Sequence, residues 1–216
     1  MKGRFITFEG MEGSGKSTQI SLCAEYLRAS RQVTFTREPG GTPIGDQVRK
    51  ILLDPANKAL DATAELLLYA ASRAQHLQEV ILPALQAGRI VLCDRFSDAT
   101  LAYQGYGRGL NREVILVLDR IVTLELRPHL TLLLDIEPAA GLKRARGRNN
   151  SLGLEGEARF ENEALAFHDR VRQGYLALAE QEPGRFRVID ASGNVDRIQA
   201  EIRRIVDDFL LMTVVS

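Results

Sequence analysis

Short runs of apolar residues recur along the chain and alternate with longer segments in which apolar residues are spaced three and four apart. The runs predict five buried strands, over Phe5–Phe8, Val33–Thr36, Ile90–Cys93, Leu130–Ile136 and Phe186–Ile189. The longer segments predict helices, over Lys16–Ser30, Ile44–Leu53, Ala64–Gln86, Glu113–Leu126, Glu161–Glu182 and Val195–Leu211. Because parallel strands need long crossover connections, this alternation predicts an α/β fold, a doubly wound five-stranded parallel sheet with helices on both faces.

The length of 216 residues suits a single domain that spans residues 1–216. One internal stretch, Gly147–Glu157, combines low hydrophobicity with several glycine and asparagine residues. We interpret it as part of a flexible lid at about 144–160, because long structureless loops in compact domains usually have a function; a plain surface loop is the alternative.

Composition narrows the possible functions. Apolar residues make up 45% and charged residues 26%, which argues against disorder and predicts a soluble protein. Lys plus Arg and Asp plus Glu each total 28, so no basic field favours nucleic acid and any anion site must be local. No apolar stretch approaches the ~18 residues of a membrane span. With no signal-peptide pattern and with Cys23 and Cys93 read as reduced core residues, we expect a cytoplasmic protein without membrane partners.

The loop after the first predicted strand fits the phosphate-binding pattern G-x-x-x-x-G-K-[ST], and a predicted helix follows it. The matching residues are Gly10, Met11, Glu12, Gly13, Ser14, Gly15, Lys16 and Ser17. Glycines let successive backbone N–H groups point at phosphate oxygens, and the helix adds its positive end. Lys16 would reach the β- and γ-phosphates of ATP, and the Ser17 hydroxyl would ligate Mg²⁺. The fold is therefore predicted to be of the P-loop NTPase type.

Asp94 and Arg95 directly follow the third predicted strand, at the sheet edge that carries the P-loop. A carboxylate there can hold or orient Mg²⁺, although a plain loop or capping residue is the alternative. Arg95 needs an acidic partner or an anionic ligand close by, since an unpaired buried charge is costly. Asp94 is accordingly our second predicted metal ligand beside Ser17.

Other residues decide which kind of P-loop protein this is. A guanine-nucleotide switch carries N-K-x-D late in the chain, whereas the nearest match, Asn57–Asp61, is one residue too long and precedes the third strand. The D-x-x-G of Asp190–Gly193 follows the last strand instead of an early one. The sequence thus lacks both the base reader and the sensor of a switch.

A small-molecule kinase needs cations that converge on an acceptor anion and a flat surface for its base. Arg49, Arg73 and Arg95 all follow elements that end at the same sheet edge. Tyr69 and Arg73 are four apart on a predicted helix and share one face, so a ring and a guanidinium can grip one ligand. A core tyrosine beside a solvated arginine is the alternative interpretation.

Arg144, Arg146 and Arg148 run into the lid, while the P-loop itself contains no arginine. The extra cation that phosphoryl transfer uses must then come from elsewhere, and we predict that Arg146 or Arg148 reaches the transferring group. A solvated basic helix end is the alternative. The predicted catalytic cations are Lys16, Arg95, Arg146 and Arg148.

Several motifs in one order resemble the bacterial branch of the thymidylate kinase family over nearly the whole chain. They are Phe8–Thr18, Thr36–Thr42, Tyr69–His76, Asp94–Phe96 and Leu101–Gly105. The resemblance implies transfer of the γ-phosphoryl of ATP to dTMP with Mg²⁺, giving ADP and dTDP for dTTP synthesis, by a homodimer. Another nucleoside or nucleoside-monophosphate kinase, or an ATP-binding module without activity, remains the alternative.

The resemblance also implies site roles. In the acceptor site, Glu12 and Glu38 would face the deoxyribose, Arg73 and Arg95 would hold the monophosphate, and Tyr69 would stack on thymine, with Arg49, Thr100, Tyr103 and Gln104 beside them. In the donor site, Thr18 joins the P-loop, Arg144 contacts ATP, and Asp190–Gly193 lies near adenine. Two departures stand out: Ala158 replaces an aspartate common in the family, and Phe96 replaces a tyrosine or histidine.

Overall fold

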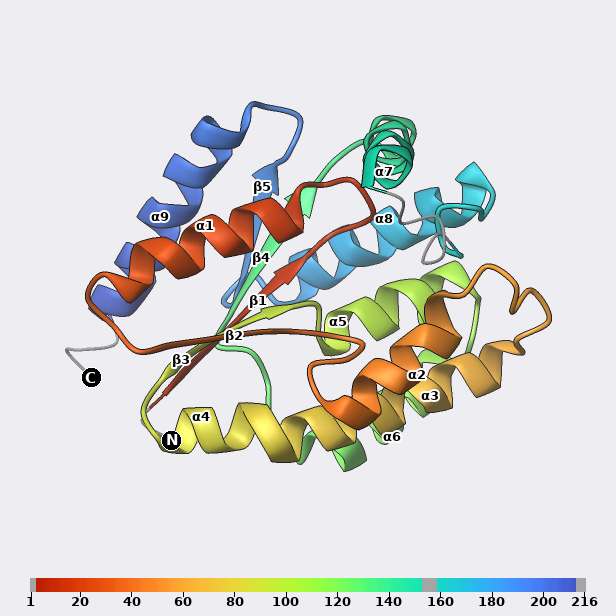
Figure 1. Cartoon of the computed structure of the whole chain (residues 1–216), viewed down its shortest axis with the longest axis horizontal. Helices are drawn as coiled ribbons and strands as arrows, with labels where there is room; N and C mark the ends of the chain where they lie inside the picture. Colours follow the sequence, from red (N-terminus) through yellow and green to blue (C-terminus); the bar gives the residue numbers. More distant parts are fainter. Residues whose placement is uncertain (1–2, 153–158, 213–216) are drawn as a thin grey trace.

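The computed structural model describes residues 3–152 and 159–212. Its sheet contains five parallel strands, as the apolar runs predict, and the structure gives their order as β2-β3-β1-β4-β5 (Figure 1). The strands are β1 (Arg4–Glu9), β2 (Val33–Arg37), β3 (Ile90–Asp94), β4 (Leu130–Asp135) and β5 (Phe186–Asp190). Within this sheet β1 pairs with β3 so that Phe8 lies opposite Asp94, which brings the residues that follow both strands together.

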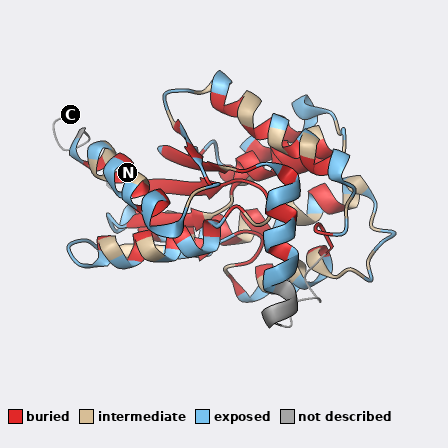
Figure 2. Ribbon diagram, turned by 90° about the horizontal axis from the view of Figure 1, so that it is seen from above, coloured by how far each residue is buried: buried red, intermediate tan, exposed pale blue. Residues whose placement is uncertain are grey.

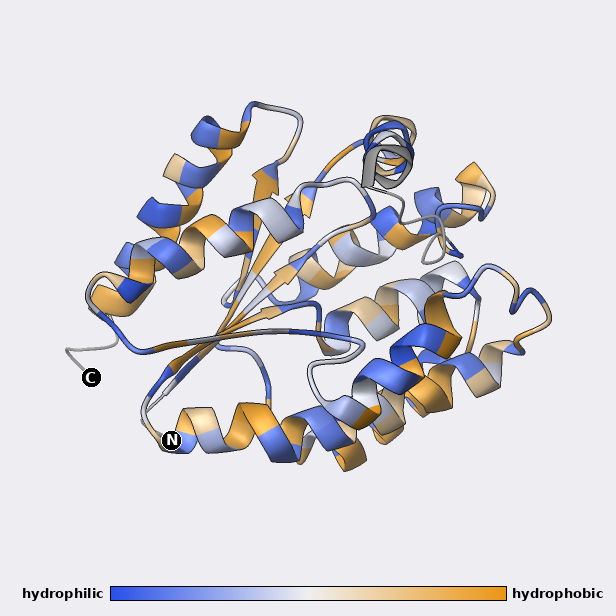
Figure 3. Cartoon of the chain, in the orientation of Figure 1, coloured by the Kyte–Doolittle hydropathy of each residue, from blue (hydrophilic) through white to orange (hydrophobic). Residues whose placement is uncertain are grey.

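Helices cover both faces of the sheet (Figure 1). On one face lie α1 (Lys16–Arg28) and α9 (Val195–Met212), whose apolar residues share a core with Ile6, Phe8 and Leu132. The remaining α-helices are α2 (Pro43–Leu53), α3 (Ala62–His76), α4 (Leu82–Gln86), α5 (Ser97–Thr100), α6 (Arg112–Thr123), α7 (Pro138–Leu152) and α8 (Leu165–Gln181). The central strands are buried, and the longer helices are buried on one side only, whereas the short α5 is buried throughout (Figure 2). The same one-sided pattern appears in hydropathy (Figure 3).

Two π-helical segments interrupt the predicted helical pattern. The segment predicted as one helix over Ala64–Gln86 is continuous, but η1 (Leu77–Ile81) separates α3 from α4 within it. A second π-helical segment, η2 (Leu101–Gly107), continues α5 and contains glycines that weaken regular α-helical bonding. Such π-helical turns often occur at functional sites. Here η2 carries Tyr103 and Gln104.

The structureless loop that we expected to begin at Gly147 is helical as far as Leu152, and the role of this segment as a lid stays a prediction. Residues up to Leu152 continue α7, which begins at Pro138, a residue suited to the first helical turn. Glu137 supports that turn by accepting a hydrogen bond from the Ala140 N–H at 3.0 Å. The leucine, alanine and arginine residues that follow are good helix formers and outweigh the cost of Gly147. The rest of the predicted lid, including Ala158, lies outside the described residues.

Candidate active site

The P-loop runs between β1 and α1 in a path that only glycine permits at Gly13. Its φ is +72°, and a Cβ there would lie 1.9 Å from the carbonyl oxygen of Gly141. The helix that follows begins at Lys16, so the N-terminal amides of α1 face the loop. Lys16 Nζ donates to the Met11 carbonyl at 2.8 Å and contacts Ser14 Oγ at 3.4 Å. The loop thus forms a closed cradle of donors around a lysine, which is the arrangement that binds phosphate groups.

The pKa of Lys16 lies below the ordinary value of a lysine. Burial and the nearby charge of Arg95 lower the pKa of Lys16 to about 8, although Asp94, Glu12 and Glu9 oppose this shift. Phosphate groups beside the ammonium would raise the pKa again, because an opposite charge favours the charged form. Binding of ATP is therefore linked to uptake of a proton above about pH 8.

We expect the Kd for ATP to be constant between about pH 7 and 8 and to increase by up to about tenfold per unit above the Lys16 pKa of about 8. The sign follows from the shift: the free protein loses the proton that the complex retains. Calorimetric titration in buffers of different ionisation enthalpy measures both the affinity and the proton uptake. An affinity that stays constant to about pH 9.5, without proton uptake, contradicts this linkage.

The predicted metal ligands meet at the mouth of the cradle. The Ser17 hydroxyl donates to Asp94 Oδ2 at 3.1 Å, while Asp94 Oδ1 is buried and has no hydrogen-bond partner. An unpaired buried carboxylate oxygen beside a hydroxyl suits a hard cation such as Mg²⁺. Among the described residues no cluster of three or more His, Cys, Asp or Glu could hold a metal alone. The remaining ligands would be phosphate oxygens and water, as is usual for Mg²⁺.

Arg95 lies at the centre of a buried polar network. Its guanidinium donates to Glu12 Oε1 at 2.9 Å, to the Tyr103 hydroxyl at 3.0 Å and to the Tyr175 hydroxyl at 3.1 Å. Its φ of +70° is unusual for a residue with a side chain and is held by a hydrogen bond from its N–H to the Phe8 carbonyl at 3.0 Å. The acidic partner predicted for Arg95 is therefore Glu12.

Two carboxylates in this network have opposite pKa shifts. Burial alone would raise the pKa of Glu12, but His168, at 3.5 Å, and the charges of Arg95 and Lys16 hold it well below its usual range. Burial, together with the charge of Asp98, raises the pKa of Glu9 to about 8, although Glu9 also accepts the Phe96 N–H at 2.7 Å. Of these two carboxylates, Glu12 is the one that stays charged at neutral pH, and it lines the cavity described next.

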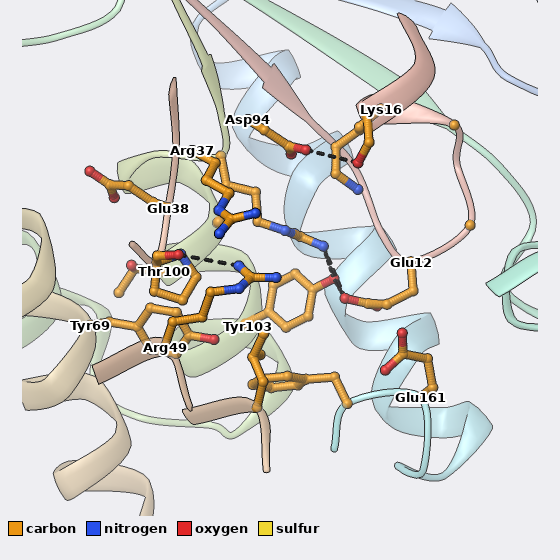
Figure 4. Close-up of a pocket in the computed structure, with 18 of the residues that line it drawn as sticks. Glu12, Lys16, Arg37, Glu38, Arg49, Tyr69, Asp94, Thr100, Tyr103 and Glu161 are labelled. Carbon is orange, nitrogen blue, oxygen red and sulfur yellow. Dashed lines mark hydrogen bonds and ion pairs between the residues drawn. The ribbon is translucent and has the colours of Figure 1, made fainter. Parts of the chain in front are cut away.

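A cavity of about 510 Å³ opens in front of the network (Figure 4). That size lies within the range of small-molecule sites, roughly 300–1,000 Å³. Lys16 and Asp94 lie at one end, and Tyr69 and Arg49 lie at the other. Most of the predicted acceptor residues line this cavity: Glu12, Glu38, Arg49, Tyr69, Arg95, Thr100, Tyr103 and Gln104. One site thus joins the phosphate cradle to the predicted acceptor residues.

Arg73 is placed differently from the other predicted acceptor residues. It lies behind the cavity wall, and its side chain is only 3% exposed. Its guanidinium donates to Glu38 at 2.7 Å and to Thr100 Oγ1 at 2.9 Å, and both of these residues line the cavity. Arg73 therefore contacts residues of the acceptor end but is not itself among the described residues that line the cavity. A direct contact between Arg73 and a monophosphate stays a prediction.

A second cavity, of about 450 Å³, lies on the other side of the P-loop. It is bordered by Gly13, Thr18 and the segment that follows β5, including Gly193. Arg144 donates to the carbonyl oxygens of Ala191 at 2.8 Å and Ser192 at 3.0 Å. The P-loop, Arg144 and the loop after β5 thus meet as predicted for a donor site.

The structure separates the two lid arginines. Arg148 lines both cavities, and its guanidinium lies 3.7 Å from Glu161. Arg146 instead donates to the Glu161 carbonyl at 3.0 Å and is not among the described residues that line either cavity. Arg148 is the better placed of the two to reach a phosphoryl group between the cavities.

Several supporting residues were missed by the sequence analysis. Glu65 is fully buried and accepts hydrogen bonds from Gln104 at 2.8 Å and from Arg159 at 2.6 Å. Tyr175 joins Arg95 to Glu9, to which its hydroxyl donates at 2.8 Å. A charged residue at an inward-facing helix position is the available sequence signal for Glu65. At the departure noted above, Phe96 is fully buried and packs edge-on against Phe5, where a hydroxyl or imidazole is not needed.

Comparisons with known proteins agree with this geometry. The family model described as thymidylate kinase matches residues 8–202. Thymidylate kinases from Syntrophotalea carbinolica and Geotalea uraniireducens are 58% and 56% identical; the alignments cover 90% and 93% of this chain and 90% and 94% of theirs. The crystal structure of thymidylate kinase from Ehrlichia chaffeensis has a TM-score of 0.76 at 35% identity, and the match covers 95% of this chain and 98% of that one. Because the family model spans most of the chain and these relatives are more than half identical to it over nearly their whole length, the chain belongs to the thymidylate kinase family.

Proposed function

We propose that this chain transfers the γ-phosphoryl group of ATP to the phosphate of dTMP, giving dTDP and ADP. The observation that carries the proposal is the shared cavity: Lys16 and Ser17 of the phosphate cradle line the same space as Tyr69 and Thr100. The two substrates can therefore meet end to end within one site. Proximity of this kind is the main requirement of phosphoryl transfer, because positioning and charge supply most of the catalysis.

At the donor end, the P-loop amides and Lys16 hold the β- and γ-phosphates. Ser17 and Asp94 would hold Mg²⁺, which when bound neutralises the charge on the phosphate oxygens. Arg95 lies between the cradle and the acceptor end and is fixed by Glu12, so its remaining N–H groups can face the incoming phosphate. Arg148 approaches from α7 and adds positive charge on the opposite side. These cations stabilise the transferring phosphoryl group.

At the acceptor end, the ring of Tyr69 offers a flat surface for thymine, and Arg49 lies beside it (Figure 4). Tyr103 donates to Glu12 at 2.6 Å, which closes the wall against which the deoxyribose would lie. Gln104 donates to Glu65, and this fixes its amide nitrogen away from the ligand. The amide oxygen of Gln104 is then free to accept from a base.

The test is ADP release with ATP, Mg²⁺ and each nucleoside monophosphate in turn. Fast release with dTMP, and slow release with the other monophosphates, is the expected result. Faster turnover of another acceptor reassigns the substrate. Tight ATP binding with no release under any condition makes the chain a binding module and overturns the proposal.

We also propose that the enzyme is a homodimer that joins through α6. This helix exposes a row of apolar side chains spaced three and four apart: Val114 (57% exposed), Val117 (55%), Ile121 (67%) and Leu124 (61%). Helix α3 packs beside α6 and exposes Leu67, and α2 packs against α3 and exposes Ile51 (Figure 1). A contiguous apolar row on the surface of a folded protein usually marks an interface, and a second copy presents the same row.

Replacing Ile121 by glutamate should convert the dimer to a monomer, because it places two like charges in an apolar interface. Sedimentation velocity on both proteins measures the change. Leu211→Glu serves as the matched control, since Leu211 is 65% exposed on α9, away from α6. A variant that remains dimeric, or a monomeric wild type, contradicts the assignment of α6.

We further propose that the chain forms one domain and works in the cytoplasm. Its hydrophobic clusters all include strands of the one sheet, which supports a single domain. Cys23 and Cys93 are buried and unpaired, which is typical of a reducing compartment. In residues 3–152 and 159–212, every helix is too short or too polar to cross a membrane.

A further inference from the structure

Asp119 lies on the inner face of α6, opposite the apolar row. Its side chain is 8% exposed and accepts a hydrogen bond from Ser97 Oγ at 2.5 Å. The same oxygen, Oδ1, lies 3.4 Å from Arg73 Nη1. A buried carboxylate needs such partners, because an uncompensated charge away from water costs several kcal/mol, roughly 3–5 when one partner is removed. Asp119 is therefore tied to an arginine on a different helix, α3.

Arg73 in turn is bonded on every side of its guanidinium. Nε donates to Glu38 at 2.7 Å, and Nη2 donates to the Phe96 carbonyl at 3.0 Å and to Thr100 at 2.9 Å. Burial alone would lower the pKa of Arg73, but Glu38 and Asp119 together raise it, so the group stays charged. The planar fork of an arginine transmits orientation, since moving one N–H moves the others.

The groups that Arg73 holds are part of the cavity wall. Glu38 and Thr100 both line the acceptor end of the cavity. The other oxygen of Glu38 is held by His76 Nδ1 at 2.9 Å, so Glu38 is clamped between a histidine and an arginine. Each member of the clamp is held by a further residue: His76 Nε2 is hydrogen-bonded to Thr36 Oγ1 at 2.6 Å, and Arg73 is held from α6 by Asp119.

We propose that Asp119 is a positioning residue for the acceptor site: from α6 it fixes the guanidinium of Arg73, and through it the carboxylate of Glu38 and the hydroxyl of Thr100. Asp119 itself is not among the described residues that line the cavity and would not touch the substrate. The inference rests on the proposed function in one respect only, namely that dTMP occupies this end of the cavity.

The charges around Arg73 explain why an uncharged residue cannot replace Asp119. With Asp119 present, Arg73 lies between two carboxylates that pull it from opposite elements, the loop after β2 and α6. Without the charge of Asp119, Glu38 is the remaining anionic partner with a contact to Arg73, and the guanidinium is drawn toward it and away from Thr100. We expect a misplaced wall rather than an unfolded protein, because asparagine keeps the shape and can still accept from Ser97.

The experiment measures KM and kcat of Asp119→Asn for both substrates. We expect the KM for dTMP to rise roughly ten- to a hundredfold, the range typical of losing one charged hydrogen bond, with the KM for ATP unchanged. Asp119→Ser repeats the test without added bulk if the asparagine variant does not fold. Asp119→Glu keeps the charge and should retain more of the wild-type dTMP affinity than Asp119→Asn or Asp119→Ser.

Ser97→Ala is the matched control. It removes the hydrogen bond from Ser97 on α5 to Asp119 on α6 but leaves the carboxylate beside Arg73. A purely structural role for Asp119 predicts that both variants lose stability and change both KM values alike. The proposal is overturned if Asp119→Asn leaves the KM for dTMP unchanged, raises the KM for ATP equally, or is matched by Ser97→Ala. If the wild-type protein releases no ADP with dTMP, the proposed function is wrong. That result is distinct from a failure of the Asp119 proposal, which requires an active wild type and an unaffected variant.

Discussion

Replacing Lys16 by methionine should reduce kcat by about a hundred- to a thousandfold while the protein remains folded. Methionine has a similar length and suits a position that is 7% exposed, so the loop should keep its path. The variant loses the ammonium group, which donates to the Met11 carbonyl and would turn to the phosphates of ATP. A preorganised donor of this kind stabilises the transition state far more than the fold, typically by a factor of about 10²–10³ for one group.

The measurement is single-turnover transfer at saturating substrates, with circular dichroism to verify folding. Lys50→Met is the matched control, because Lys50 is exposed on α2 and is not among the described residues that line either cavity. The control should retain nearly full activity. Wild-type turnover in the Lys16 variant would exclude this lysine from the chemistry.

Replacing Arg148 by alanine should lower kcat by about ten- to a thousandfold at nearly unchanged affinity for dTMP. Arg148 lines both cavities and is 47% exposed, so its guanidinium has room to move toward a phosphoryl group between them. An interaction made mainly in the transition state reduces kcat and kcat/KM together. Rapid-quench measurement of the transfer step separates this effect from slow product release.

Two variants of the same helix control for charge. Arg146→Ala removes an arginine that holds the Glu161 carbonyl, and it should have the smaller effect of the two. Lys143→Ala removes an exposed cation of α7 that is not among the described residues lining the cavities. If Arg148→Ala turns over like wild type, α7 is only a cover, and Lys16 and Arg95 supply the charge. A larger loss in Arg146→Ala would reverse the assignment.

Patterns of short range determined most of what the sequence could predict. The apolar runs located all five strands, and the P-loop motif located the cradle because its geometry is local: glycines, a lysine and the start of a helix within a few residues. Residues that follow parallel strands lie at the same edge of the sheet. This placed Asp94 and Arg95, which end and follow β3, beside the cradle that follows β1, since β1 and β3 are neighbours. The same edge and the spacing of Tyr69 and Arg73 on one helix face also suggested Arg49, Tyr69, Arg73 and Arg95 as acceptor residues. The remaining acceptor residues came from the family resemblance.

Contacts between distant segments were out of reach. Nothing near Glu65 in the sequence indicates that Arg159 will lie against it, and Glu9 gives no sign of the Tyr175 hydroxyl. The same holds for Arg73, whose partners come from the loop after β2 and from α6. Helix α7 was missed for another reason: asparagine and glycine in its last turns suggested a loop, whereas the arginines and leucines around them favour a helix.

In the dimer that we propose, helix α6 has one face toward a second copy and the other toward Arg73, and this arrangement would link two equilibria. If association with a second copy steadies Asp119 and thereby tightens the binding of dTMP by some factor, thermodynamic reciprocity requires that dTMP tightens the association by the same factor. Dilution of the protein and depletion of dTMP would then both favour the monomer. The acceptor would be a ligand of the assembly as well as a reactant, and each protomer would hold its partner most firmly when its own pocket is filled.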